Sequence, residues 1–207
     1  MITINNEITE IEIKIIEAAN TVFLKNGVDS ATMGQIAEVA EISRTSLNYY
    51  FRSKNHLVKK VLNNLENKIV PTVSFLLEDE NIPLIVKVEL FVDEYISLIT
   101  KYPLVPSFMA WELNRDPNWI IQLIKQRNLN FDKFINQIEN EVKDGSVIPF
   151  KLEDLFVNIL GLCAFPFVTK ALLMEFFFEH DEEKISQFMA SRKVDVKRII
   201  RNWLKPD

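Results

Sequence analysis

The sequence contains little glycine, proline and cysteine, and each shortage excludes a class of structure. Four glycines and eight prolines in 207 residues leave few turn signals, and β-branched residues seldom alternate with polar ones, so the chain is predicted to be all-α. The single cysteine, Cys163, excludes an internal disulfide framework and fits a reducing compartment. Because the N-terminus also lacks the basic and apolar segments of a secretory signal, we expect a cytoplasmic protein.

Residues that support catalysis or metal binding are equally scarce. His56 and His180 lie far apart, and neither has cysteines or acids at metal-ligand spacing, so we expect no metal or other cofactor. No histidine lies at a suggestive spacing from Cys163, which favours a small core residue over a nucleophile. The longest uncharged run, residues 155–169, is 15 residues long and is too short to span a bilayer. The sequence therefore predicts neither an enzyme nor a membrane protein.

The most informative stretch runs from Thr32 to Lys54 and predicts two short helices joined by a tight turn. Thr32 and Ser43 are good N-cap residues for the two helices. The first helix has a small apolar face, and the second points Leu47 inward, followed by Tyr50 or Phe51; the apolar face is formed by Ile36, Ala37, Val39 and Ala40. Small residues allow the second helix to lie close across the first, as in a helix-turn-helix.

The outward side of the second helix carries side chains that suit contact with DNA. Donors, acceptors and an aromatic ring of the size that reaches base edges or phosphates are supplied by Arg44, Thr45, Ser46, Asn48 and Tyr49. Residues 43–60 contain five basic residues and no acidic one, although the net charge of the chain is −5. A solvated basic helix face is the alternative, but its coincidence with a helix-turn-helix pattern favours a polyanion-binding site.

These residues resemble the TetR family of bacterial transcriptional repressors. The resemblance rests on Phe23 and Gly27, then on the patterns T-x-x-x-I-A, S-x-x-x-L, Y-Y-F and S-K-x-x-L; it is specific over roughly residues 8 to 62, and extends further only as a layout of helices. It implies that Arg44, Thr45, Ser46, Asn48 and Tyr49 face DNA, and that Thr32, Tyr50 and Lys54 contact phosphates. It also implies a homodimer that pairs through the last two long helices.

Three positions depart from the family pattern. Glu41 stands where the family usually has a turn glycine, so the turn is either wider or less favourable in its backbone conformation. Gly34 removes one phosphate contact that a polar or basic residue supplies in relatives. Asn48 replaces a frequent tyrosine, so a base preference cannot be transferred from relatives.

The remaining helices follow from apolar spacing and from stop signals. We expect them at residues 7–26 with a stop at Gly27, from Ser53 with a kink or end at Pro71, from an Asn81 cap to Lys101, in S-F-M-A-W-E-L, over 116–143, over 151–178 and over 181–204. In the helix that ends at Lys101, the apolar ladder is predicted at Val86, Leu90, Phe91 or Glu94, Tyr95 and Leu98. We place a helix-turn-helix domain at 1–54 and a helical effector-binding and dimerisation domain at 55–207.

The stretch 151–178 is apolar nearly all round and is predicted to be the most buried helix. Pro166 removes a hydrogen bond to the carbonyl of Leu162 and opens the helix locally. A mostly apolar ligand pocket is predicted around this position, lined by Phe91, Tyr95, Phe108, Met109, Trp111, Cys163, Phe165 and Phe167. A packed core that contains an awkward proline is the alternative.

Two functions of different classes follow. The first is a ligand-responsive transcriptional regulator, a repressor, which binds a near-palindromic operator in double-stranded DNA as a homodimer and is released by a small apolar effector. The second is a helical small-molecule-binding protein or enzyme whose N-terminal unit is a protein-interaction module. A steep salt dependence of binding to duplex DNA separates the first from the second.

Overall fold

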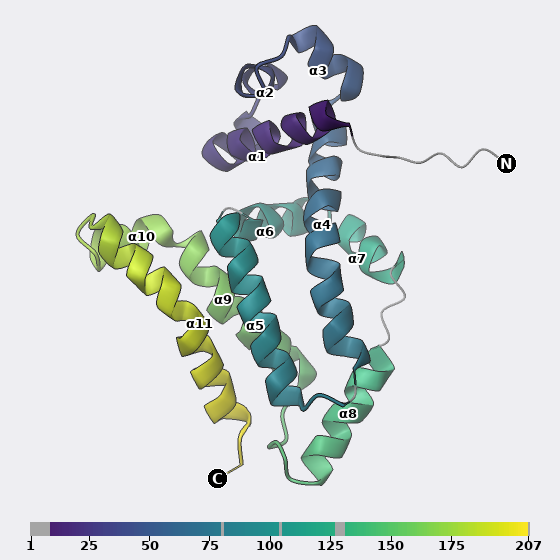
Figure 1. Ribbon diagram of the computed structural model, residues 1–207, viewed down its shortest axis with the longest axis vertical. Coiled ribbons are helices and arrows are strands. Elements are labelled where there is room, and N and C mark those ends of the chain that lie inside the picture. The colour runs from purple at the N-terminus through teal and green to yellow at the C-terminus, as the bar shows by residue number, and fades with distance from the viewer. Residues whose placement is uncertain (1–8, 80, 104, 127–130, 207) are drawn as a thin grey trace, which may run out of the picture. The chain divides into compact units, whose positions relative to one another are not determined.

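A computed structural model describes residues 9–79, 81–103, 105–126 and 131–206, and every regular element in these ranges is a helix. Figure 1 labels these helices along the chain. The helices are α1 (Glu10–Ser30), α2 (Met33–Val39), α3 (Arg44–Tyr50), α4 (Lys54–Glu78), α5 (Leu84–Lys101), α6 (Val105–Arg115), α7 (Pro117–Gln126), α8 (Phe131–Lys143), α9 (Leu152–Val168), α10 (Lys170–Phe176) and α11 (Glu182–Leu204). The all-α prediction is confirmed.

The chain divides into two compact units, Met1–Lys68 and Ile69–Asp207, and the division falls inside α4. We placed the first domain at 1–54 from the sequence; the first compact unit extends further, because Leu57, Val58 and Leu62 of α4 are buried. These apolar side chains complete the core of the first unit; between them, Lys59 is exposed and Lys60 is half-buried.

The first unit is built from α1, α2, α3 and the start of α4. Helix α1 packs against α2, and α2 packs against α3. Three capping residues begin its helices as the sequence predicted: Thr32 accepts from the backbone N–H of Gln35, Ser43 from that of Ser46, and Ser53 from that of His56. Gly27 has a φ of 73° and a ψ of 157°, so regular helical geometry breaks there although α1 resumes to Ser30.

The second unit is organised around α5, α9 and α11, which contact one another in pairs. Figure 1 shows α5 and α11 side by side. The two helices are antiparallel, because Lys197 contacts Asp93 whereas the later Arg201 contacts the earlier Glu89. The common core contains the buried residues Leu84, Val88, Val92, Ile96, Ile99, Leu155, Ile159, Cys163, Phe167, Val196, Ile200 and Leu204. Bonds from Glu141 of α8 reach the first turn of α5, because both carboxylate oxygens accept from the backbone N–H of Leu84, at 2.9 and 3.2 Å.

The buried face of α5 differs from the predicted one. Val86 and Leu90 of the predicted ladder are 43% and 40% exposed, whereas Val88 and Val92 are buried. Apolar residues recur at a spacing of four on two neighbouring stripes of this helix, so periodicity alone does not choose between them. The choice comes from α9 and α11, which cover the stripe that contains Val88.

The prediction of one helix over 151–178, buried on most sides, is wrong. The segment forms α9 and α10, which are bent by 65° at Thr169. Only one face of α9 is buried: Cys163 has no exposed surface, but Val157 and Phe165 are 63% and 64% exposed. Hydropathy indicates which side chains favour burial. It does not distinguish a helix face that is buried within one chain from a face that is buried against a partner.

Other boundaries differ in smaller ways. We expected a kink or an end at Pro71; α4 continues past this position to Glu78, which excludes the end, and the kink stays a prediction. The expected cap at Asn81 is also wrong, because the N-cap position of α5 is Pro83. The segment 116–143 contains α7 and α8, between which residues 127–130 lie outside the described ranges. Within the described ranges no single helix is long and apolar enough to cross a membrane, whereas the bent pair of α9 and α10 passes on length and composition.

Candidate nucleic-acid interface and interior site

Helix α3 presents one face to the core and the opposite face to solvent. Leu47 has no exposed surface, and Phe51, directly after the helix, is 1% exposed. These two side chains fix the rotation of α3, since apolar residues four apart lie on one helical face. The N-cap bond from the backbone N–H of Ser46 to Oγ of Ser43, at 3.0 Å, fixes where the helix begins.

The predicted DNA-facing residues are brought together on this outer face. Arg44, Thr45, Asn48 and Tyr49 are exposed, and Tyr49 reaches 82% exposure. Tyr50 is half-buried, and its ring meets that of Tyr49 edge-on at 5.3 Å. Ser46 is also half-buried, at the margin of the face.

Thr32 lies at the start of α2, where its hydroxyl serves as a cap. Its Oγ1 accepts from the backbone N–H of Gln35 at 3.2 Å, and its own N–H donates to Oε1 of Gln35 at 2.9 Å. This reciprocal pair is a capping box, which satisfies two backbone donors of the helix end. Thr32 is exposed, and its phosphate contact remains a prediction.

Lys54 lies in the first turn of α4, as expected, and its ammonium group is bonded within the first unit. Its Nζ donates to the backbone carbonyls of Val28, Asp29 and Ala31 at 2.9, 2.9 and 3.2 Å. An ammonium group has three donors, so all three are used within the first unit. The geometry therefore favours a structural role for Lys54, which ties the first turn of α4 to the end of α1, over an anchor for phosphate.

Glu41 adopts the strained conformation that was one of the two expected outcomes. Its φ is 51°, in the left-handed region where a side chain is unfavourable. Its carboxylate accepts a hydrogen bond from Nζ of Lys14 at 2.9 Å, and this bond lowers the pKa of Glu41 below its usual 4.5. The acid nearest the start of α3 is thus neutralised by a residue of α1.

The predicted pocket residues fall into separate groups. Phe91 and Tyr95 of α5 stack at 5.6 Å, and Cys163 and Phe167 of α9 are buried in the same core. On α6, Phe108 is buried and Met109 is half-buried.

Two further pocket residues lie elsewhere. The ring of Trp111 on α6 lies 5.2 Å from Cζ of Arg115. Phe165 is 64% exposed and does not join the interior group, because it lies on the uncovered face of α9.

Two groups in the interior have displaced protonation equilibria. Burial raises the pKa of the Tyr95 hydroxyl to about 12, and the neighbouring Cys163 adds to the shift. Burial also raises the pKa of the Cys163 thiol to about 12, against which the guanidinium of Arg192 acts. A thiol that stays protonated is a poor nucleophile, in keeping with Cys163 as a core residue.

The sequence reasoning missed Lys14 and Arg192. Lys14 lies 27 positions from its partner Glu41, and no local pattern marks a contact over that separation. Arg192 had a detectable signal, because it follows Ile185 by seven positions and precedes Val196 by four, a spacing that places all three on one helical face. A positive charge in an apolar stripe is rare and is worth tracing to its contacts.

The fold and the exposed outer face of α3 together define an all-helical protein with an N-terminal helix-turn-helix. Residues 15–61 match the family model described as bacterial regulatory proteins, tetR family. The HTH-type transcriptional regulator QacR of Staphylococcus aureus is 38% identical over 55 residues, 27% of this chain and 29% of QacR. TtgR of Pseudomonas putida, of the same type, is 39% identical over 59 residues, 28% of each chain. The resemblance to the TetR family is confirmed, and the matches span less than a third of these relatives.

Solved structures extend the likeness to the fold of the whole chain. The HlyIIR protein with residues 170–185 replaced by alanine aligns over 100% of both chains with a TM-score of 0.61 and 17% identity. A protein of Shewanella sp. PV-4 assigned to the tetR family of transcription regulators aligns over 96% of this chain and 100% of its own, with a TM-score of 0.58 and 16% identity. At such identities the likeness concerns the fold alone.

Proposed function

We propose that the protein is a ligand-responsive transcriptional regulator, a repressor, which binds a near-palindromic operator as a homodimer and is released by a small, largely apolar effector. The observation that carries the proposal is the outer face of α3. Its exposed side chains include Arg44, Asn48 and Tyr49, and it is held in place by buried Leu47. Arginine pairs with guanine and asparagine with adenine in the major groove, so this face is suited to reading bases.

The charge distribution supports the same assignment. Between positions 43 and 60 the chain has five basic residues and no acidic one, although its net charge is −5. Outside that range, the Lys14 bond neutralises Glu41 on the turn before α3. Phosphate contacts position the protein and release counterions, so each contact steepens the dependence of affinity on salt by about 0.9 in a double-logarithmic plot.

The second unit supports a homodimer. Along α9, Val157 and Phe165 are exposed by 63% and 64%, and on α11 Val194 is 66% exposed. Gly161 lies between the two exposed residues of α9, and a Cβ placed on it would meet nothing within 4 Å. A helix face that is apolar, exposed and flat at a glycine suits close approach of a second helix. We assign this face of α9 and α11 to the contact between two copies.

Operator binding is tested by selecting bound duplexes from a random pool, followed by titration of the selected site. We expect a two-fold symmetric sequence and a steep negative salt slope. Arg44→Ala and Tyr49→Ala should each weaken specific binding about 5- to 150-fold, the effect of losing about 1–3 kcal/mol of base contact. Lys143→Ala removes the same charge from an exposed position at the end of α8 and should leave affinity unchanged. Specific binding retained by both α3 variants contradicts the assignment of that face.

The dimer contact is tested by light scattering of Phe165→Asp. A buried carboxylate without a partner is costly, so this variant should be monomeric at concentrations where the wild type is dimeric. Leu113→Asp is the matched control, since Leu113 is 46% exposed on α6 and lies outside the proposed contact. A dimeric Phe165→Asp protein would place the contact elsewhere.

A further inference from the structure

Helix α11 carries a positive charge in its buried stripe. Ile185, Val196 and Ile200 are at most 1% exposed, and Met189 and Arg192 occupy the two positions between them on the same helical face. Arg192 is only partly exposed, and its Nε is buried. A guanidinium thus replaces the aliphatic side chain that the stripe otherwise has at this level.

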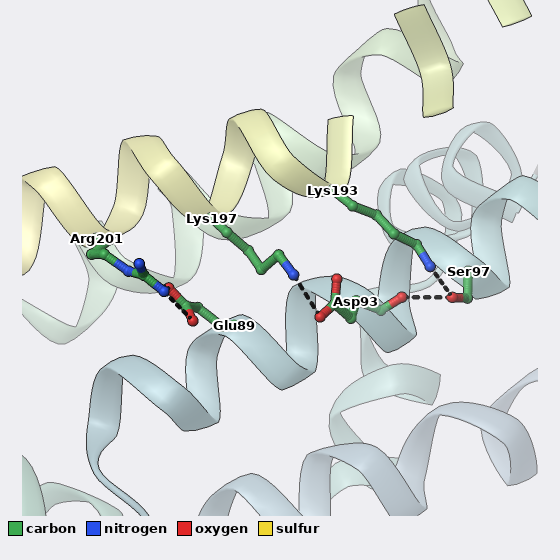
Figure 2. A network of polar contacts seen from close by, with 6 residues as sticks. All are labelled: Glu89, Asp93, Ser97, Lys193, Lys197 and Arg201. Atoms are coloured by element: carbon green, nitrogen blue, oxygen red, sulfur yellow. Dashed lines mark hydrogen bonds and ion pairs between the residues drawn. The ribbon is translucent and has the colours of Figure 1, made fainter. Parts of the chain in front are cut away.

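Three other cations of α11 have polar partners on α5, and a fourth, Arg198, pairs with Asp195 of its own helix. Figure 2 shows Lys193 beside Ser97, Lys197 beside Asp93, and Arg201 beside Glu89. Their donor–acceptor distances are all 2.7 Å, and these contacts lie along the outside of the helix pair. Positive side chains on α11 are therefore matched where they can be, which makes the environment of Arg192 the exception.

Among the described residues, Arg192 forms one hydrogen bond, to a backbone carbonyl. Its Nη2 donates to the carbonyl oxygen of Leu162 at 3.3 Å; this carbonyl lacks its usual helical donor because residue 166 is proline. The buried Nε has no hydrogen-bond partner, and none of the ion pairs formed among the described residues includes Arg192. A buried N–H without a hydrogen-bond partner is unfavourable, and a charged acceptor such as a carboxylate would satisfy it.

The surroundings of Arg192 limit the kind of anion that would fit. Its Cζ lies 5.6 Å from the centre of the Phe188 ring, and Leu162 and Met189 pack against the apolar core beside it. Buried Cys163 is close enough for the guanidinium to influence its thiol. An apolar environment of this kind disfavours a phosphate dianion, and the planar guanidinium matches a carboxylate.

We propose that Arg192 binds the carboxylate of a small organic acid whose apolar body lies between α9 and α11. Nε and a free N–H of the same guanidinium face the carboxylate, and the bond to Leu162 remains with Nη2. That this acid is the effector rests on the proposed function. The binding site at Arg192 does not depend on that function. The effector thereby gains a negative charge that an apolar pocket alone does not imply.

The test is calorimetric titration of the full chain with octanoate and with 1-octanol, which differ in the carboxylate. Octanoate should bind the wild type at least tenfold more tightly than 1-octanol, and Arg192→Met should remove this difference. Lys193→Met is the matched control, because it removes the neighbouring charge of α11, whose partner is Ser97; it should bind octanoate as the wild type does. Equal binding of acid and alcohol by the wild type overturns the proposal, as does undiminished octanoate binding by Arg192→Met.

A structural role for Arg192 predicts a different pattern. If the guanidinium served only to satisfy Leu162, Arg192→Met would lower the melting temperature, and Pro166→Ala would restore it by returning a helical N–H, with octanoate binding retained throughout. We expect instead that the double variant folds and binds octanoate no more tightly than 1-octanol. Because these titrations contain no DNA, a protein that binds octanoate but no duplex would contradict only the proposed function.

Discussion

Replacing Lys54 by methionine should destabilise the first unit before it affects any contact with DNA. The ammonium group donates to the carbonyls of Val28, Asp29 and Ala31, and the bonds to Val28 and Ala31 are partly buried. A hydrogen bond that involves a charged group contributes about 1.5 kcal/mol or more to stability. Counting only the two partly buried bonds, Lys54→Met should cost about 3 kcal/mol, since methionine keeps the aliphatic chain and loses the donors.

Hydrogen exchange read by mass spectrometry resolves this loss within the full chain. A cost of about 3 kcal/mol corresponds to roughly a hundredfold faster exchange of protected amides between α1 and the start of α4. Peptides of the second unit should be unaffected. Lys59→Met is the matched control, since Lys59 is exposed on the same helix, and its effect on stability should stay within about 0.5 kcal/mol.

The reasoning about Lys54 is refuted by the opposite pattern. If Lys54→Met leaves exchange unchanged but lowers operator affinity and reduces the salt slope by about one, the ammonium contacts phosphate. That result would restore the role that the resemblance to the TetR family implied. It would also mean that the three carbonyl bonds are given up when the protein binds DNA.

Three further perturbations test single features of the fold. Glu41→Gly should raise the melting temperature, because glycine accepts the φ of 51° without a side-chain penalty, and the exposed pair with Lys14 contributes little; a lower melting temperature contradicts this. A double-mutant cycle on Arg201 and Glu89, in urea, should give a coupling below about 1 kcal/mol that shrinks in 1 M salt, since the Arg201 side chain is 57% exposed. The hydrogen bond from the backbone N–H of Lys184 lowers the pKa of Asp181 below 3.8. The ionised Asp181 therefore stabilises the folded state above pH 4, and this stabilisation is lost as the pH falls through the lowered pKa of the folded state. Asp181→Asn should weaken the dependence of the urea midpoint on pH in this acid range.

Local signals in the sequence were sufficient for most of the first unit. Thr32, Ser43 and Ser53 were expected to begin helices, and each accepts a hydrogen bond from a backbone N–H three positions later. Buried Leu47 likewise fixes the outer face of α3 as expected. Capping and helical spacing act over three or four residues, so a short window of sequence contains the relevant partners.

Contacts between distant positions were not predictable in the same way. The carboxylate of Glu141 bonds to the N–H of Leu84, 57 positions earlier, and this contact takes the place of the side-chain cap that Asn81 was expected to provide. Lys54 similarly reaches carbonyls 23 to 26 positions away. A lysine or glutamate has a long, flexible side chain, so its charged group can contact solvent, a ligand or a remote backbone group. Only the packed arrangement chooses among them.

Two departures from the hydropathy of the second unit concern helices α9 and α11. Helix α9 is apolar on nearly all sides, yet Phe165 is 64% exposed; conversely, α11 has Arg192 within a buried apolar stripe, with an unpartnered Nε. Each is unfavourable for an isolated chain, the first through exposed apolar surface and the second through a buried N–H that lacks a hydrogen-bond acceptor. A second copy of the chain would cover the exposed apolar surface of α9, and an organic anion would supply the acceptor for Nε of Arg192. The pattern of apolar and charged residues thus suits an assembly of two chains with bound acid better than it suits one chain alone.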